Sequence, residues 1–237
     1  MNKPLGVIFD IGGTLLHLES ANAVEGNRRL LEYAEPPVDK TAEELTELVN
    51  KHYESTFGVA DRDNIQIRIP EFYRLLFETI GLSFSIGYVD IERLFWNTTM
   101  KYRPNDGIYD TLDKLDEYGI KTGVITNSAF SGEIMLGELG KHDMAHRFSF
   151  LISSSDYGIR KPDRRIFDVG IKKIGLEPDD IWFVGDKADY DIKGAINSGL
   201  FPVFYNWRNE TLEIDGEHLI VNNWYEFHDK VELLYNG

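Results

Sequence analysis

The residues Leu5-Gly6-Val7-Ile8-Phe9-Asp10-Ile11-Gly12-Gly13-Thr14 decide the fold of this chain. A short apolar run that suits a buried strand is followed by a carboxylate and then by two glycines, which allow the backbone to turn sharply. In an open parallel sheet, ligands bind beyond the carboxyl ends of the strands. We therefore expect residues 5–9 to form a strand of such a sheet and Asp10 to lie at a functional site.

Similar apolar or β-branched runs recur and alternate with segments of helical periodicity. The further runs predicted as strands are Lys121–Thr126, Phe148–Ile152, Ile181–Val184, Leu200–Tyr205 and His218–Val221. The predicted helices are Ile108–Tyr118, Gly132–Leu139, Arg164–Ile174, Ala188–Asn197 and Trp224–Leu234. This alternation predicts an α/β fold with a doubly wound, Rossmann-like parallel sheet that helices cover on both faces.

Residues 17–103 interrupt the alternation. Four helical patterns occupy this stretch, at Asn22–Tyr33, Ala42–His52, Pro70–Ile80 and Val89–Thr99. We therefore predict two domains: a Rossmann-like core formed by residues 1–16 and 104–237, and an all-helical insertion formed by residues 17–103.

Composition excludes several classes of function. The chain has 237 residues, and its 40 acidic against 25 basic side chains give a net charge of −15, so nucleic acid and anionic membranes are poor partners. It has no cysteine, which excludes disulfides and cysteine nucleophiles and fits a reducing compartment. Neither a signal peptide nor a run of roughly 18 apolar residues is found. We expect a cytoplasmic protein; its oligomeric state is not predicted.

Polar residues follow the predicted strands. Asp186 ends the Ile181–Val184 strand, and Asp191 comes shortly after it. Two carboxylates that meet at strand ends repel each other and need a cation, and hard carboxylate oxygens suit Mg²⁺. Thr126 and Asn127 end another strand, and Lys161 lies in a later loop. Together with the glycines after Asp10, these groups predict a phosphoryl pocket in which a carboxylate is positioned to attack.

Four segments, taken in order, resemble a known family. They are Phe9-Asp10-Ile11-Gly12-Gly13-Thr14-Leu15, Ile125-Thr126-Asn127-Ser128, Arg160-Lys161-Pro162-Asp163, and Val184-Gly185-Asp186 continuing through Asp191. Together they resemble the motifs of the haloacid dehalogenase superfamily of hydrolases, in the branch with a helical cap inserted after the first motif. The resemblance covers about residues 3–16 and 103–221, so residues 17–103 match in position and helical character alone.

The resemblance implies a role for each motif residue. Asp10 would be the nucleophile and a Mg²⁺ ligand, and the Gly12 carbonyl and Asp186 would complete the protein ligands. Thr126 would hold the phosphoryl oxygens with the help of Asn127. Lys161 would neutralise negative charge on the nucleophile and the phosphoryl group, and Asp191 would orient Lys161 or metal-bound water. The implied activity is Mg²⁺-dependent hydrolysis of a small phosphorylated metabolite through an aspartyl-phosphate on Asp10.

Gly12 departs from the family's phosphatase pattern. Phosphatases of the superfamily usually carry an aspartate two positions after the nucleophile, which protonates the leaving group. His17 and Glu19 are the nearest titratable substitutes in the sequence. Two alternatives stay open: a 2-haloacid dehalogenase that uses Asp10 without metal, and a catalytically weak binding protein. In the insertion, the arginines at positions 28, 29, 62 and 68 are weaker candidates for substrate clamps.

Overall fold

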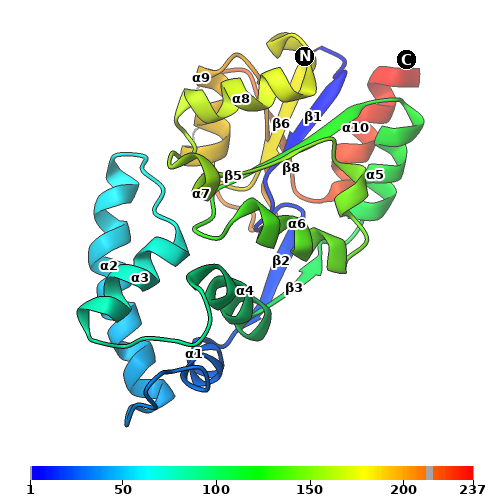
Figure 1. The fold of residues 1–237 in the computed structure, drawn as a ribbon. Coiled ribbons are helices and arrows are strands. Elements are labelled where there is room, and N and C mark those ends of the chain that lie inside the picture. The colour runs from blue at the N-terminus through cyan, green and yellow to red at the C-terminus, as the bar shows by residue number, and fades with distance from the viewer. Residues whose placement is uncertain (1, 212–215, 237) are drawn as a thin grey trace.

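A computed structural model describes residues 2–211 and 216–236. Its centre is a six-stranded sheet in the order β5-β4-β1-β6-β7-β8, in which every neighbouring pair is parallel (Figure 1). The strands are β1 (Gly6–Phe9), β4 (Lys121–Thr126), β5 (Leu151–Ser153), β6 (Ile181–Gly185), β7 (Phe201–Tyr205) and β8 (Leu219–Val221). The predicted parallel α/β architecture is confirmed.

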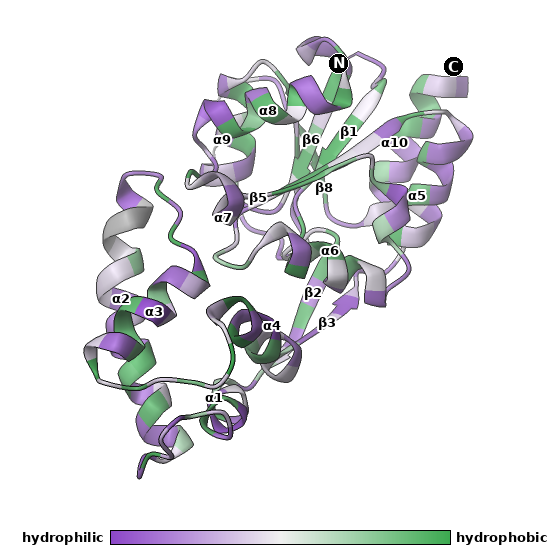
Figure 2. Cartoon of the chain, viewed as in Figure 1, coloured by the Kyte–Doolittle hydropathy of each residue, from purple (hydrophilic) through white to green (hydrophobic). Residues whose placement is uncertain are grey.

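Alternation along β1 builds a separate core on each face of the sheet. Val7 and Phe9 pack into one apolar cluster, whereas Ile8 packs into the other, because successive strand side chains point to opposite faces. The helices α5 (Ile108–Glu117), α6 (Gly132–Lys141) and α10 (Trp224–Asn236) cover the first face, and α8 (Arg164–Ile174) and α9 (Lys193–Asn197) cover the second. Figure 2 shows the strands β1 and β6 mainly in the colours of apolar residues between these helices.

Short elements complete the core. They are α7 (Ser154–Tyr157), the 3₁₀ turns Ala145–Arg147 and Pro178–Asp180, and a π-helical turn at Ala188–Ile192. The predicted helix Ala188–Asn197 is thus a π turn followed by α9. The Lys187 N–H donates to the Asp191 carboxylate at 3.0 Å, so the side chain of Asp191 bonds back to the start of this turn.

The insertion contributes four helices: α1 (Ala23–Leu31), α2 (Ala42–Arg62), α3 (Ile69–Thr79) and α4 (Tyr88–Thr99). Figure 1 places them beyond the carboxyl end of β1, beside the core. They have an aromatic core of their own, in which the Tyr73 ring stacks on Phe77 at 5.0 Å and meets Phe95 edge-on at 5.7 Å. The aromatic residues of the insertion therefore serve largely to hold its helices together.

The insertion is not helical throughout, which the sequence analysis did not foresee. The strands β2 (Leu16–Ala21) and β3 (Met100–Pro104) pair antiparallel where the chain leaves the core and returns to it. Most of β2 is exposed, and its register shifts between Leu18 and Ser20. A half-exposed, bulged strand has no buried apolar run, so the pattern that identified the other strands is missing here. None of the helices in the described residues is long and apolar enough to cross a membrane.

Candidate active site

Three strand ends converge on one cavity. Asp10 follows β1, Thr126 ends β4 and Asp186 follows β6, and β4 and β6 are the two neighbours of β1. These residues line a cavity of about 350 Å³ together with Gly12, Asn127, Lys161 and Asp191. The structure therefore brings together all seven residues that the sequence analysis assigned to the site.

The turn after β1 fits closely against Asp186. The backbone N–H of Asp10 donates to the Val184 carbonyl at 2.9 Å, which ties this turn to β6. Gly13 has a φ of 84°, and a Cβ at this position would lie 2.4 Å from Asp186 Oδ2. Only glycine combines that conformation with such a close approach. At Gly12, by contrast, a Cβ would meet no atom within 4 Å.

Lys161 is the cation at the centre of the site. Its side chain is 1% exposed, and its Nζ lies 2.7 Å from Asp10 Oδ1 and 2.6 Å from Asp191 Oδ1. The same ammonium donates to the Ile125 carbonyl at 2.9 Å. An ammonium group has three N–H donors, so these three partners fix the position of Lys161 beside Asp10.

The buried charges of this cluster stabilise one another. Burial by itself lowers the pKa of Lys161, but Asp10 and Asp191 outweigh burial and raise the pKa above its usual value. Burial raises the pKa of Asp191, and the charge of Lys161 opposes that rise. Lys161 therefore stays protonated at neutral pH and holds a fixed positive charge against the carboxylate of Asp10.

Asn127 joins two loops of the site. Its amide Nδ2 donates to the Lys161 carbonyl at 3.0 Å, and its Oδ1 accepts from the Lys161 N–H at 2.8 Å. This reciprocal pair holds the backbone of Lys161 against the loop after β4. The residue was predicted to help bind phosphoryl oxygens, and its observed contacts show that it also supports the position of Lys161.

Asp186 has a partner that the sequence analysis missed. Arg208, in the loop after β7, places its Nη1 2.9 Å from Asp186 Oδ2, and Lys187 Nζ lies 3.8 Å from the same oxygen. Burial and the nearby charge of Asp10 raise the pKa of Asp186, and the two cations oppose that rise. No sequence motif marks Arg208, because its role depends on where a loop folds back.

The carboxylates fit a hard divalent cation. Asp10, Asp186 and Asp191 each offer an oxygen within 4.8 Å of the others. Asp186 Oδ1 is buried without a hydrogen-bond partner, and a buried carboxylate oxygen in that state is costly. Gly12 belongs to the same cavity wall. Oxygen donors of this kind suit Mg²⁺, so the donor set agrees with the predicted ligands.

The insertion closes one side of the cavity. Trp96 of α4 and Tyr102 of β3 stack with ring centroids 5.6 Å apart, and Phe130 of the core meets Trp96 at 4.7 Å. All three line the cavity. The indole Nε1 of Trp96 donates to buried Glu138 at 2.8 Å. This wall is therefore apolar and aromatic, and a hydrogen bond to the core fixes its central ring.

A second contact joins the insertion to the core, and we call it the cap–core bridge. Ile65 forms an isolated antiparallel bridge with Ile159. Around it, the Gln66 N–H donates to the Gly158 carbonyl at 3.0 Å, and the Arg160 N–H donates to the Asn64 carbonyl at 3.0 Å. The bridge thus ends one residue before Lys161, so the insertion contacts the loop that carries the buried cation.

Other candidates lie elsewhere. His17 packs edge-on against Trp207 at 5.1 Å, and Glu19 is half-exposed and lies 3.9 Å from Arg103. Neither residue lines the cavity that holds Asp10. Arg28 and Arg29 pair with glutamates of their own helix, and Arg68 pairs with Glu71. Arg28 and Arg29 belong to a solvated helix face, and Arg68, which directly precedes α3, does not line the cavity either.

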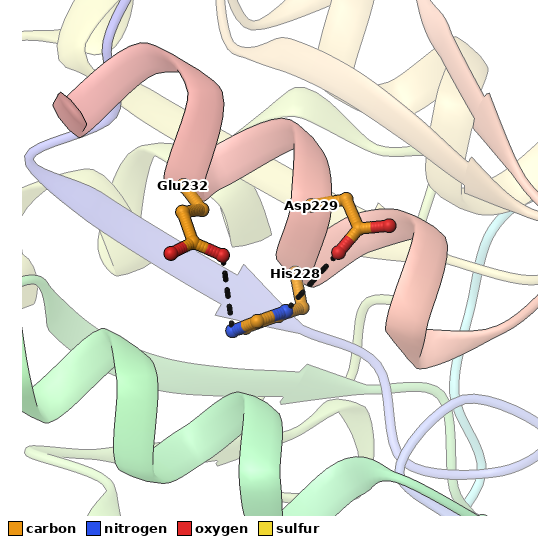
Figure 3. Close-up of side chains that lie close together, drawn as sticks. All are labelled: His228, Asp229 and Glu232. Carbon is orange, nitrogen blue, oxygen red and sulfur yellow. Dashed lines mark ion pairs between the residues drawn. The ribbon is translucent and has the colours of Figure 1, made fainter. Parts of the chain in front are cut away.

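A second group of ligand-type side chains lies on α10, far along the chain from the motifs. His228 Nδ1 is 3.4 Å from Asp229 Oδ1, and its Nε2 is 4.0 Å from Glu232 Oε2. Figure 3 shows the two carboxylates beside different nitrogens of the imidazole ring. One ligand-type atom of each residue lies within 4.8 Å of the others. Since each carboxylate contacts a different ring nitrogen, we interpret the group as polar contacts along one face of α10.

Comparison with known proteins agrees with this geometry. A family model described as haloacid dehalogenase-like hydrolase matches residues 7–204. A glyceraldehyde 3-phosphate phosphatase of Pyrococcus furiosus is 26% identical over 223 residues, which cover 90% of this chain and 84% of that protein. One of Methanothermobacter thermautotrophicus is 32% identical over 121 residues, 51% of each chain. For three archaeal glyceraldehyde 3-phosphate phosphatases that it matches, the chain spans 42–51% of their length.

Solved structures share the fold. A 2-haloacid dehalogenase from Pseudomonas syringae has a TM-score of 0.66 at 21% identity, and the match covers 99% of this chain and 100% of that one. At this level of identity the likeness establishes the fold alone.

Proposed function

We propose that this chain, which belongs to the haloacid dehalogenase-like hydrolases, is a Mg²⁺-dependent phosphatase of a small phosphorylated metabolite. The observation that carries the proposal is the buried group of Asp10, Lys161 and Asp191 beside Asp186, whose Oδ1 has no hydrogen-bond partner. Relatives named as glyceraldehyde 3-phosphate phosphatases support phosphoryl chemistry.

The first step is attack by Asp10 on the phosphorus atom. A carboxylate oxygen of Asp10 forms a bond to phosphorus, the ester oxygen leaves with the bond electrons, and an aspartyl-phosphate results. Lys161 lies 2.7 Å from Asp10 Oδ1, so it neutralises charge beside the reacting centre. Thr126, at the end of β4, faces the same cavity and donates its hydroxyl to a phosphoryl oxygen.

The second step is attack by water on the aspartyl-phosphate, which releases inorganic phosphate and restores the carboxylate of Asp10. Asp186, Asp10 and the Gly12 carbonyl would hold Mg²⁺, and the bound ion would stabilise the negative charge that phosphoryl transfer spreads over the oxygens. Asp191 and Asn127 hold Lys161 in place from two directions. These supporting contacts keep the ammonium group of Lys161 beside Asp10 through both steps.

Gly12 restricts which substrates turn over rapidly. No side chain at this position protonates the leaving group, and neither His17 nor Glu19 lines the cavity. A general acid typically contributes a factor of roughly 10²–10⁴ in rate. We therefore expect substrates whose leaving group needs little protonation, such as acyl phosphates or activated esters, to be hydrolysed fastest.

The insertion, residues 17–103, acts in this proposal as a cap over the cavity that contains Asp10. Its aromatic wall covers one side of the cavity that holds Asp10, and the cap–core bridge ties the insertion to the loop that carries Lys161. A closed cap excludes bulk water while the phosphoryl group is transferred. The cap residues that contact the leaving group are then the ones that select the substrate.

Metal-independent 2-haloacid dehalogenation is the second candidate. Gly12 favours it, and an (S)-2-haloacid dehalogenase of Pseudomonas fluorescens is 29% identical over 124 residues. Asp186 argues against it, because an additional buried carboxylate would repel a haloacid anion. Halide release from a 2-haloacid in the presence of a chelator would establish this activity instead.

The test is phosphate release from a panel of phosphorylated metabolites and one activated aryl phosphate, with Mg²⁺ or with chelator. We expect metal-dependent turnover that is lost in Asp10→Asn, and trapping with a phosphate-like metal fluoride should place the adduct on Asp10. Full activity of Asp10→Asn would remove the mechanism. Silence across the panel by the folded protein, together with no halide release, would favour a catalytically weak binding protein.

A further inference from the structure

The loop after β7 delivers a cation to the carboxylate cluster. Arg208 Nη1 lies 2.9 Å from Asp186 Oδ2, and the side chains are 34% and 1% exposed, respectively. The guanidinium group lies over the Trp207 ring at 4.2 Å. The loop itself is closed by two hydrogen bonds between Asn206 and Glu210, at 3.0 and 2.8 Å. Arg208 is therefore positioned by its own loop as well as by its charge.

The charges around Asp186 explain why a cation is needed there. Asp10, Asp186 and Asp191 carry three formal negative charges, and Lys161 is engaged by Asp10 and Asp191 rather than by Asp186. Lys187 is 3.8 Å from Asp186 Oδ2, but half of its side chain is exposed, so solvent screens it. Arg208 is thus the cation in closest contact with Asp186 among the described residues.

We propose that Arg208 is a resident counter-ion of Asp186 that competes with the divalent cation for this carboxylate and so sets the affinity of the site for Mg²⁺. The inference rests on the proposed metal site. Without Mg²⁺, the guanidinium group neutralises a buried carboxylate that would otherwise destabilise the fold. When Mg²⁺ binds, the ion takes over that role, and the contact of Arg208 with Asp186 is weakened or lost.

The direct test is Mg²⁺ binding by isothermal titration calorimetry, with the wild type and Arg208→Gln in the absence of substrate. Removing a competing positive charge should tighten Mg²⁺ binding on the order of tenfold. Arg165→Gln is the matched control, because Arg165 is an exposed arginine of the core that pairs with Asp163 at 2.6 Å. That variant removes the same charge from the chain and should leave the dissociation constant unchanged.

Thermal unfolding gives a second readout that does not depend on activity. Arg208→Gln should unfold at a lower temperature than the wild type in chelator, and saturating Mg²⁺ should raise its Tm by more than it raises that of the wild type. Arg208→Lys, which keeps the charge without the planar fork, should lie between the two. This variant also serves if Arg208→Gln is too unstable to purify.

Equal or weaker Mg²⁺ binding by Arg208→Gln would overturn the inference, since a competitor cannot help the ion to bind. Asp186→Asn separates this failure from failure of the proposed function. If the wild type binds Mg²⁺ and Asp186→Asn does not, the metal site stands whatever Arg208 does. If neither the wild type nor Arg208→Gln binds Mg²⁺, both the inference and the metal dependence are wrong, and turnover in chelator then decides the hydrolase activity separately.

Discussion

The ion pairs at the candidate site in the core and those on the helices of the insertion differ in burial. In the core, Lys161 is 1% exposed and contacts two carboxylates. In the insertion, Arg28 is 55% exposed and pairs with Glu25 one helical turn away. Exposed pairs of this kind contribute about 0–1 kcal/mol to the free energy of unfolding. Removing one partner of a buried pair lowers that free energy by about 3–5 kcal/mol. The comparison teaches that burial, rather than the number of charged residues, distinguishes the cluster around Lys161 from the solvated ion pairs of the insertion.

The two regions also differ in how they are held. The core is built around one six-stranded sheet with apolar clusters on both faces. The insertion has aromatic packing of its own, and it contacts the core through the β2–β3 pair at its base, through the cap–core bridge, and through α4, whose Trp96 packs on Phe130 and donates to Glu138. These contacts hold the insertion beside the cavity that contains Asp10.

The largest expected effect comes from Lys161→Gln. The change leaves Asp10 and Asp191 facing each other in a buried site without their shared cation. We expect phosphate release to fall by about a hundredfold to a thousandfold and the free energy of unfolding to fall by about 3–5 kcal/mol. Steady-state kinetics and urea unfolding measure the two effects.

Arg28→Gln is the matched control in the insertion. Because Arg28 is exposed and paired within its own helix, the free energy of unfolding should change by less than about 1 kcal/mol, and turnover should not change. A loss of turnover in Arg28→Gln comparable to that of Lys161→Gln would contradict this comparison of the two regions. Arg28 would then again be a candidate for binding the substrate.

Gly12→Asp tests whether the general acid that is missing from the first motif can be restored. A Cβ at this position meets no atom within 4 Å, so the new side chain has room. A carboxyl group there should protonate the leaving oxygen, and esters with poor leaving groups should be hydrolysed faster by about tenfold to a hundredfold. Activated aryl phosphates should gain little. An equal gain for both kinds of ester, or a loss of both, would show that the side chain does not act as a general acid.

The sequence predicted the core well because its signals are local. Each strand is a short apolar run, and Asp10, Thr126 and Asp186 are placed by the ends of neighbouring parallel strands. Lys161 and Asp191 were placed by their motifs, and the structure brings both within contact distance of each other. The catalytic roles of these residues stay predictions until they are tested by substitution.

The missed features depend on tertiary structure. The strands β2 and β3 are exposed and bulged, so no apolar run marks them. Arg208 reaches Asp186 from a loop 22 positions later in the sequence, and no periodicity connects two such residues. The contacts of Asn127 with the Lys161 backbone were also beyond prediction, because an asparagine after a strand has many possible partners.

Gln66→Ala weakens the attachment of the cap with a moderate effect. The Gln66 side chain is buried, and its Oε1 accepts from Ser154 Oγ at 2.9 Å. Loss of this hydrogen bond should lower the free energy of unfolding by about 1 kcal/mol and raise KM more than it lowers kcat, because the closed cap becomes less populated. Glu47→Ala, at an exposed position of α2, should change neither parameter. If kcat falls alone, the contact supports the chemistry rather than closure.

The smallest expected effect concerns Glu92, a buried residue of α4. Its carboxylate accepts hydrogen bonds from the N–H and the Oγ of Ser131, at 2.7 and 3.1 Å. Ser131 directly precedes α6. Burial raises the pKa of Glu92, and the bonds from Ser131 oppose that rise. Folding therefore favours the protonated form, so this residue's contribution to stability decreases as the pH rises from the usual glutamate range toward neutrality.

Glu92→Gln keeps an acceptor for Ser131 and removes the titration. Relative to the wild type, the variant should gain stability between pH 5 and pH 7 in urea unfolding, by less than the changes expected for Lys161 and Gln66. Glu133→Gln, an exposed glutamate in the first turn of α6, controls for loss of a surface charge. If Glu92→Gln and the wild type differ in free energy of unfolding by the same amount at both pH values, burial does not raise the pKa of the Glu92 carboxylate. The Glu92 carboxylate would then behave like the solvated charges of the insertion rather than like the buried charges around Lys161.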